Sequence, residues 1–159
     1  MNNRVSPRTY IAECAVGHGL FAGESIAAGT EILRLTGPLL TLNEVRAKGP
    51  SLAANALQIG IDRYLDLDAP GRFINHSCAP NAAIVRDTVV VAIRPIAAGE
   101  EIRFDYSTTI SDGWTMECRC GETECRGLVV AFQLLPETIR RRYAILGHVQ
   151  TFIVEDVGS

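Results

Sequence analysis

The sequence predicts a mainly β fold with short helices and one longer helix near the C-terminus. Short apolar segments alternate with turn residues along most of the chain, which is the pattern of many short strands. Sustained helical spacing is clearest over residues 136–146. With 159 residues, of which 47% are hydrophobic, the chain is long enough to bury one core of its own. We therefore expect a single mainly β unit.

A first strand is predicted over residues 8–14, and Gly17-His18-Gly19 follows it. Glycines at this spacing allow either a plain tight turn or a backbone segment that approaches a ligand closely. No third glycine opens a helix afterwards, so the segment is not a dinucleotide-binding fingerprint. The two interpretations of this glycine pair stay open at this point.

Residues 26–35 predict a turn followed by a strand, and residues 96–104 repeat the pattern I-A-A-G-x-E-I. Two short copies so far apart predict two similar turn-and-strand pieces of one sheet system, not a solenoid. A short helix is expected over residues 42–48, ended by Gly49-Pro50.

Two hairpins are predicted in the middle of the chain. Residues 57–61 and 64–67 alternate in hydrophobicity on either side of a polar pair. Residues 82–85 and 89–93 form a second β pair of the same kind. Residues 107–113 are expected to be a loop.

The last predicted element is a helix over residues 136–146, with a proline at its start and a glycine directly after it. Its arginines, residues 140–142, are expected to form a solvated face instead of a binding patch. Tyr143 and Phe152 are expected to hold this tail by apolar packing instead of contacting a substrate.

Composition excludes several classes of function. The 18 acidic residues outnumber the 15 lysines and arginines, which argues against binding nucleic acid through its phosphates and permits a basic peptide as partner. No apolar run approaches the roughly 20 residues that cross a bilayer, and residues 1–7 lack the apolar core of a secretion signal. We expect a cytoplasmic protein without a membrane partner, with the nucleus or a host cell as alternatives. The sequence leaves the oligomeric state open.

The cysteines suggest a metal site. Cys118, Cys120 and Cys125 give the spacing Cys-x-Cys-x4-Cys, one thiolate short of the four that a closed structural zinc site uses. Cys78 lies in an irregular segment that could aim a fourth thiolate, whereas Cys14 ends an apolar strand and suits a buried small hydrophobe. A reduced cluster without metal is the alternative, although such exposed thiols would be prone to oxidation.

Residues 72–81, Arg-Phe-Ile-Asn-His-Ser-Cys-Ala-Pro-Asn, are the most unusual stretch of the chain. Two asparagines, a histidine, a cysteine and a proline within ten positions suit neither a helix nor a regular strand. Such a segment persists in a folded domain only if the tertiary structure holds its polar groups in place. We pair it with residues 103–106, Arg-Phe-Asp-Tyr, as two halves of one site.

Four motifs together resemble the SET-domain protein lysine methyltransferases, in the form that carries a zinc-binding post-SET segment. They are residues 17–22 (GHGLFA), 72–81 (RFINHSCAPN), 99–106 (GEEIRFDY) and 118–127 (CRCGETECRG). They occur in the family's order and cover about residues 9–128. The second and fourth motifs are the most specific.

The resemblance implies a SET-domain fold of several small curved β sheets with a pseudoknot, short helices and a C-terminal helix. In the pseudoknot, residues 75–78 would thread beside the loop near Tyr106. The implied boundaries are 8–107 for the SET domain, 115–131 for the post-SET zinc-binding segment, and 132–159 for a C-terminal helical extension.

The resemblance also implies S-adenosyl-L-methionine as cofactor, bound on the face opposite the substrate lysine. The first glycine motif would contact its methionine end, the central motif its amino group and adenine, and one leucine its adenine ring. These cofactor-binding residues are Gly17, His18, Gly19, Asn75, His76 and Leu128.

One structural zinc ion, Zn2+, is implied as well, held by four cysteines. The metal ligands by resemblance are Cys78, Cys118, Cys120 and Cys125. Trp114, which precedes this knot, would be either part of a lid over the substrate channel or packing beneath the zinc.

Tyr106 is the implied catalytic residue. Methyl transfer to an amine is an in-line displacement, so positioning contributes most, and a narrow apolar channel would lower the pKa of the attacking lysine. We do not expect Tyr106 to act as a general base, because a phenol is protonated at neutral pH. Phe104 stands where the family has Phe or Tyr, and by resemblance it leaves room for di- and trimethylation.

The expected partner is a basic, lysine-containing protein or peptide, a histone or another basic protein. The chain has no cysteine-rich segment before the core, its insert over residues 36–56 is short, and Gln58 stands near where many relatives place a tyrosine. Two alternatives remain: a catalytically inactive, zinc-stabilised peptide-binding module, and a redox or metal-storage protein that would leave the other motifs unexplained.

Overall fold

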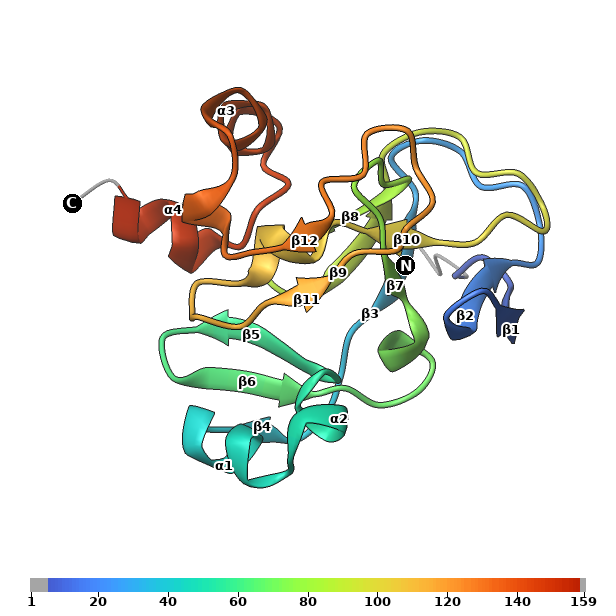
Figure 1. The fold of residues 1–159 in the computed structure, drawn as a ribbon. Coiled ribbons are helices and arrows are strands. Elements are labelled where there is room, and N and C mark those ends of the chain that lie inside the picture. The colour runs from blue at the N-terminus through green and yellow to red at the C-terminus, as the bar shows by residue number, and fades with distance from the viewer. Residues whose placement is uncertain (1–5, 158–159) are drawn as a thin grey trace, which may run out of the picture.

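The computed structural model describes residues 6–157, and within this range the strands form five small sheets of two or three strands each. The predicted mainly β fold with short helices and a C-terminal helix is confirmed (Figure 1). Residues 1–5, which belong to the segment that lacks a signal-like apolar core, lie outside the described residues. No helix in the described part is both long and apolar enough to span a bilayer.

The N-terminal hairpin pairs β1 (Thr9–Cys14) with β2 (Gly17–Ala22) in antiparallel register. Of the two interpretations left open for the glycine pair, the plain turn is not observed, because both glycines belong to β2 and the turn lies just before them, at Ala15 and Val16. Gly17 needs its glycine, since its φ of +116° disfavours other residues.

The two hairpins predicted in the middle of the chain are present. β8 (Ala82–Val85) and β9 (Val89–Ala92) pair antiparallel, and β3 (Glu31–Arg34) completes that sheet. β5 (Ala56–Gly60) and β6 (Arg63–Asp66) form the other hairpin.

The β5–β6 sheet is extended by β4 (Leu39–Leu40) and covered by two short helices. The helix expected over residues 42–48 is α1 (Leu42–Ala47), and a capping box at Thr41 and Glu44 starts it. Pro50 does not simply end the helical region. It opens α2 (Pro50–Ala53), because proline is tolerated in the first turn of a helix.

The centre of the fold is a parallel pair, β7 (Asn75–His76) with β10 (Arg103–Phe104). A 3-10 turn, η1 (Gly71–Phe73), precedes β7, and another, η2 (Tyr106–Thr109), follows β10, where the sequence predicted only loop. Residue Ser77 continues the pairing by donating its N–H to the Phe104 carbonyl at 3.0 Å. The central motif and the Tyr106 segment therefore lie side by side, as expected of a pseudoknot.

Beyond this pair the chain forms a small hairpin and a helical tail. The elements are β11 (Met116–Glu117), β12 (Leu128–Val129), η3 (Phe132–Leu134), α3 (Glu137–Leu146) and α4 (Thr151–Val157). Their packing forms two apolar clusters, one around the cysteines and one between α3 and α4, separate from the main core.

The main core lies between the sheets and is built from their inward-facing aliphatic side chains. It includes Leu20 of β2, Val90 of β9 and Ile102 before β10, each fully buried. Phe104 belongs to this core and Tyr106 packs against it, so the main core supports both active-site candidates.

A buried carboxylate, Asp105, joins the tail to the centre. Its side chain is completely buried and accepts hydrogen bonds from the Ser107 N–H at 3.0 Å and from Arg126 at 2.8 Å. The Tyr143 hydroxyl donates to its other oxygen at 2.8 Å. Tyr143 thus packs in the tail, as predicted, and in addition makes a polar contact that the prediction did not include. Burial, followed by the charge of Asp105, raises the pKa of Tyr143.

Replacement of Tyr143 by phenylalanine should destabilise the fold, because it leaves one oxygen of a buried carboxylate without its donor. Hydrogen bonds to charged groups contribute about 1.5–3 kcal/mol, and we expect a loss in the free energy of unfolding of about that size in urea denaturation. Tyr10→Phe is the matched control, since Tyr10 is exposed. Equal stability of Tyr143→Phe and Tyr10→Phe would contradict this role of the Asp105 contact.

Candidate active site

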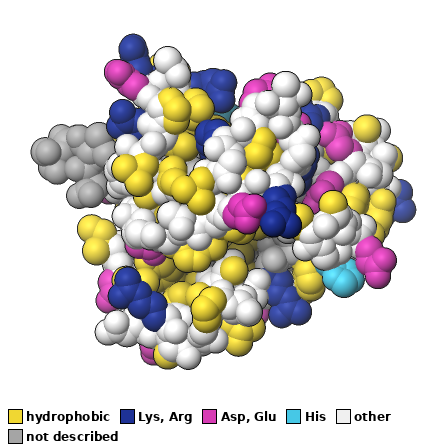
Figure 2. All heavy atoms as spheres, viewed as in Figure 1, with side chains coloured by type: hydrophobic (Ala, Val, Ile, Leu, Met, Phe, Trp, Pro, Cys, Tyr) yellow, Lys and Arg dark blue, Asp and Glu magenta, His cyan; other side chains and the backbone are white. Residues whose placement is uncertain are grey.

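A cavity of about 340 Å³ opens beside the β5–β6 sheet and the Tyr106 segment. In Figure 2 the corresponding face is hollowed across its middle, and hydrophobic side chains gather in the hollow. α1, β5 and the segment from Ile110 to Trp114 contribute to its walls. Lining residues used below are Arg46, Gln58, Tyr64, Ile74, Phe104, Tyr106, Asp112 and Trp114.

Tyr106 and Phe104 line this cavity together, with ring centroids 4.9 Å apart. The Tyr106 hydroxyl donates to the Ile74 carbonyl at 2.6 Å. Burial, and secondarily the charge of Glu101, raises the pKa of Tyr106 well above that of a free phenol. Tyr106 therefore keeps its proton at neutral pH, which agrees with the expectation that it is not a general base.

His76 faces the protein with both ring nitrogens. Its Nδ1 accepts from the Tyr106 N–H at 3.0 Å, so the proton of the neutral ring lies on Nε2, which is 3.3 Å from the Cys78 Sγ. Burial lowers the pKa of His76 to about 4, and the nearby Asp105 only partly offsets this. Both ring nitrogens of His76 therefore have partners within the protein.

Asn75 projects to the other side of β7, toward β2. Its Nδ2 donates to the His18 carbonyl at 2.9 Å and to the Glu101 Oε1 at 2.8 Å, and it lies 3.5 Å from the Cys14 Sγ. A Cβ added to Gly19 would lie 2.3 Å from that Glu101 oxygen. The glycine motif and the central motif therefore meet through backbone and side-chain contacts, and only a glycine fits between them undisturbed.

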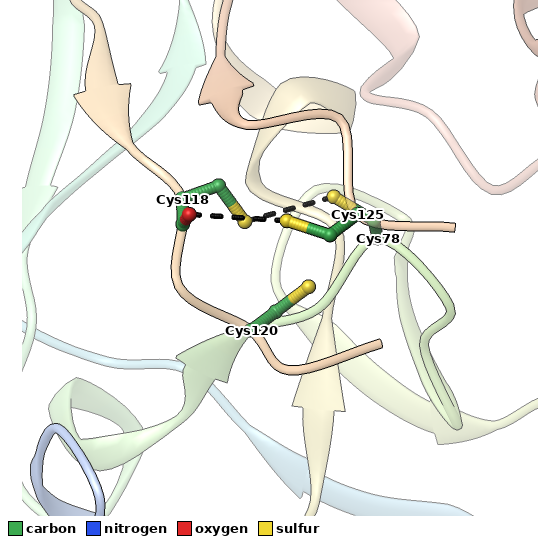
Figure 3. A group of neighbouring side chains, drawn as sticks. All are labelled: Cys78, Cys118, Cys120 and Cys125. Atoms are coloured by element: carbon green, nitrogen blue, oxygen red, sulfur yellow. Dashed lines mark hydrogen bonds between the residues drawn. The ribbon is translucent and has the colours of Figure 1, made fainter. Parts of the chain in front are cut away.

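Four cysteines converge in one cluster, and their sulfur atoms point toward one another in Figure 3. All four Sγ atoms lie within 4.8 Å of one another, and those of Cys78 and Cys118 are 3.7 Å apart. A tetrahedral site with Zn–S bonds of about 2.3 Å separates its sulfurs by about 3.8 Å, so this group fits a structural zinc ion. The fourth member is Cys78.

Cys14 is not part of this cluster. The interpretation of Cys14 as a buried hydrophobe is wrong too, because it is half-exposed and its sulfur lies beside the Asn75 amide. No residue of strand β1 is buried, three being exposed and three partly buried, so its apolar residues do not mark a buried face.

Two alternatives for Trp114 turn out to be compatible. Trp114 lines the cavity and also packs against the apolar cluster that contains Cys78 and Cys118. Leu128, on β12, is 47% exposed despite its size.

Sequence reasoning missed the polar side chains of the cavity wall and the hydrogen bonds that they make. The Tyr64 hydroxyl donates to Asp112 at 2.8 Å, and burial together with this carboxylate raises the pKa of Tyr64. The Gln58 amide nitrogen donates to the Ser111 hydroxyl at 2.9 Å, and the Gln58 amide oxygen accepts from the Ser111 N–H at 3.0 Å. Nothing local in the sequence marks these contacts, because each joins the β5–β6 hairpin to a loop about 50 positions away.

The chain belongs to the SET domain family, whose model matches residues 17–107, more than half of the chain. Similar proteins include the "Histone-lysine N-methyltransferase, H3 lysine-4 specific" of Saccharomyces cerevisiae, 31% identical over 81% of this chain. The histone-lysine N-methyltransferases trithorax of Drosophila virilis and ash1 of Drosophila melanogaster are 33% and 31% identical over 69% and 71% of it. The chain covers 14%, 3% and 6% of these three proteins.

Loss of one cysteine should abolish metal binding by the cluster. A Cys125→Ser variant is expected to purify with much less than one zinc per chain, because a hard hydroxyl oxygen is a poor substitute for a thiolate. Atomic emission spectroscopy gives the metal content, and Cys14→Ser, outside the cluster, should keep the wild-type value. A full complement of zinc in Cys125→Ser would show that the four-cysteine site is wrong.

Proposed function

We propose that this protein is an S-adenosylmethionine-dependent protein-lysine N-methyltransferase. The observation that carries the proposal is the placement of Tyr106: this residue lines a largely apolar cavity, while its backbone N–H donates to the His76 ring in the segment that follows Asn75. Membership of the SET domain family and the histone-lysine methyltransferase relatives support it. S-adenosylmethionine supplies an electrophilic methyl group on a positively charged sulfur.

The cavity suits a lysine side chain that must lose its proton. Phe104, Trp114 and Ile74 provide apolar walls, and desolvation there disfavours an ammonium and lowers the lysine pKa. Because the Tyr106 hydroxyl already donates to Ile74, its oxygen is left as an acceptor for an amine N–H. Tyr106 therefore orients the amine, and its dipole acts on the charge that disperses during transfer.

The cofactor side is proposed to lie opposite the cavity, at the glycine motif and Asn75. Gly17 and His18 are exposed at this place, whereas Gly19 is buried beside the Glu101 carboxylate. Asn75 and the backbone of His76 lie next to it, and the exposed Leu128 would cover an adenine ring. A zinc ion on the four cysteines would fix the segment from which Leu128 projects.

The substrate is proposed to be a basic, lysine-bearing protein, with histones included because the relatives are histone-lysine methyltransferases. For the same reason the nucleus is a possible site of action. Phe104 is buried and carries no hydroxyl that would hold a water in the channel. We therefore propose that the amine can accept a second and a third methyl group.

Replacement of Tyr106 by phenylalanine should lower kcat roughly 100-fold or more, the size seen when one preorganised hydroxyl or amide is removed from a reacting centre. Its affinity for S-adenosylmethionine should be unchanged, because Tyr106 lines the cavity and not the proposed cofactor side. Mass spectrometry of histones and of a cell lysate incubated with enzyme and cofactor measures the products.

Tyr10→Phe controls for the loss of an unrelated tyrosine hydroxyl and should be fully active. The same spectra count methyl groups, and only monomethyl-lysine at saturating cofactor would contradict the role of Phe104. A wild-type protein that binds the cofactor and basic peptides but transfers no methyl group would instead establish a binding module.

A further inference from the structure

Glu101 carries a carboxylate that the protein leaves without a cation. The adjacent Glu100 is fully engaged: it pairs with Arg94 at 2.7 Å and accepts from the Ala97 N–H at 3.0 Å. The Glu101 carboxylate has one hydrogen bond, from the Asn75 amide, and no lysine or arginine of residues 6–157 forms an ion pair with it. Two neighbouring glutamates thus have different surroundings.

Glu101 is fixed against the glycine strand. A backbone bridge joins it to Phe21 of β2, and the following residue, Ile102, donates its N–H to the Leu20 carbonyl at 2.8 Å. These contacts bring the carboxylate so close to Gly19 that a Cβ there would lie 2.3 Å from its Oε1. The carboxylate is therefore placed by backbone pairing at the edge of the proposed cofactor site.

The surroundings of Glu101 are rich in acceptors. The His18 carbonyl, the Cys14 sulfur and the Glu101 carboxylate all lie within 3.5 Å of one donor, the Asn75 amide nitrogen. An amide group has two hydrogens and no charge, so it cannot satisfy these acceptors or neutralise the carboxylate. A half-buried carboxylate in such a place favours a cationic donor, and an ammonium group offers three hydrogens and a full charge.

We propose that Glu101 binds the α-ammonium group of the methionine portion of S-adenosylmethionine, together with the carbonyl of His18. The assignment deepens the proposed function and rests on it. In addition to any contact that Asn75 itself makes with the cofactor, its amide then holds the Glu101 carboxylate in place. The charge of Glu101 contributes to the raised pKa of Tyr106, so the Glu101 carboxylate lies within electrostatic range of the reacting centre.

Glu101→Gln tests the assignment by isothermal titration calorimetry. Glutamine keeps the shape and can still accept from Asn75, so the change removes mainly the charge. A hydrogen bond between charged groups corresponds to a loss of roughly 10- to 100-fold in affinity. S-adenosylmethionine and S-adenosylhomocysteine both retain the ammonium, and we expect the same loss for both. Glu100→Gln, whose carboxylate points to Arg94, should bind both like the wild type.

The outcomes separate the assignment from the function on which it rests. Unchanged affinity in Glu101→Gln would overturn the assignment and leave the cofactor proposal intact. A loss confined to S-adenosylmethionine would place Glu101 at the sulfonium and overturn it as well. A wild type that binds neither compound would overturn both. Circular dichroism checks that the variants are folded. If Glu101→Gln is unfolded, Glu101→Asp takes its place, because it withdraws the charge by one methylene. This variant should bind both ligands with equally reduced affinity, and unchanged affinity would overturn the assignment.

Discussion

The parallel pairing of β7 with β10 is the constraint on which the rest of the structure depends. A parallel pair cannot be closed by a tight turn, so the chain must cross over between its strands. That crossover contains the β8–β9 hairpin, which packs into the main core. Because successive side chains of a strand point to opposite faces, Asn75 faces the glycine strand and His76 faces Tyr106 and Cys78.

One short loop thereby serves two sites. Asn75 contacts the strand that carries Gly19, whereas Cys78, three residues later, belongs to the zinc-fitting cluster. Arg126, which follows the last cysteine, returns to Asp105, next to Tyr106. Tyr143 ties the tail to the same carboxylate. The four-cysteine cluster and the tail are thus attached to the active-site segment by specific polar contacts as well as by apolar packing.

Local patterns could predict the hairpins, α1 and α3, because alternation, capping and proline or glycine signals act between neighbouring residues. The motifs also indicated Tyr106 and the cysteines. The place of Gly17 in a strand was not predictable, since pairing with β1 overrides the preference of glycine. Contacts of Asn75 with Glu101 and of Tyr143 with Asp105 depend on which distant segments the crossover brings together. No local signal encodes them.

We predict that metal binding and cofactor binding are interdependent, and a calorimetric titration measures this directly. S-adenosylmethionine is titrated into zinc-loaded protein and into protein freed of zinc by a chelator, with circular dichroism to verify that the β core remains folded. Coupling between sites is typically 5- to 150-fold, and we predict a loss of cofactor affinity of about that size after zinc removal. Equal affinity of the two forms would contradict the central claim that the loop from Asn75 to Cys78 joins the two sites.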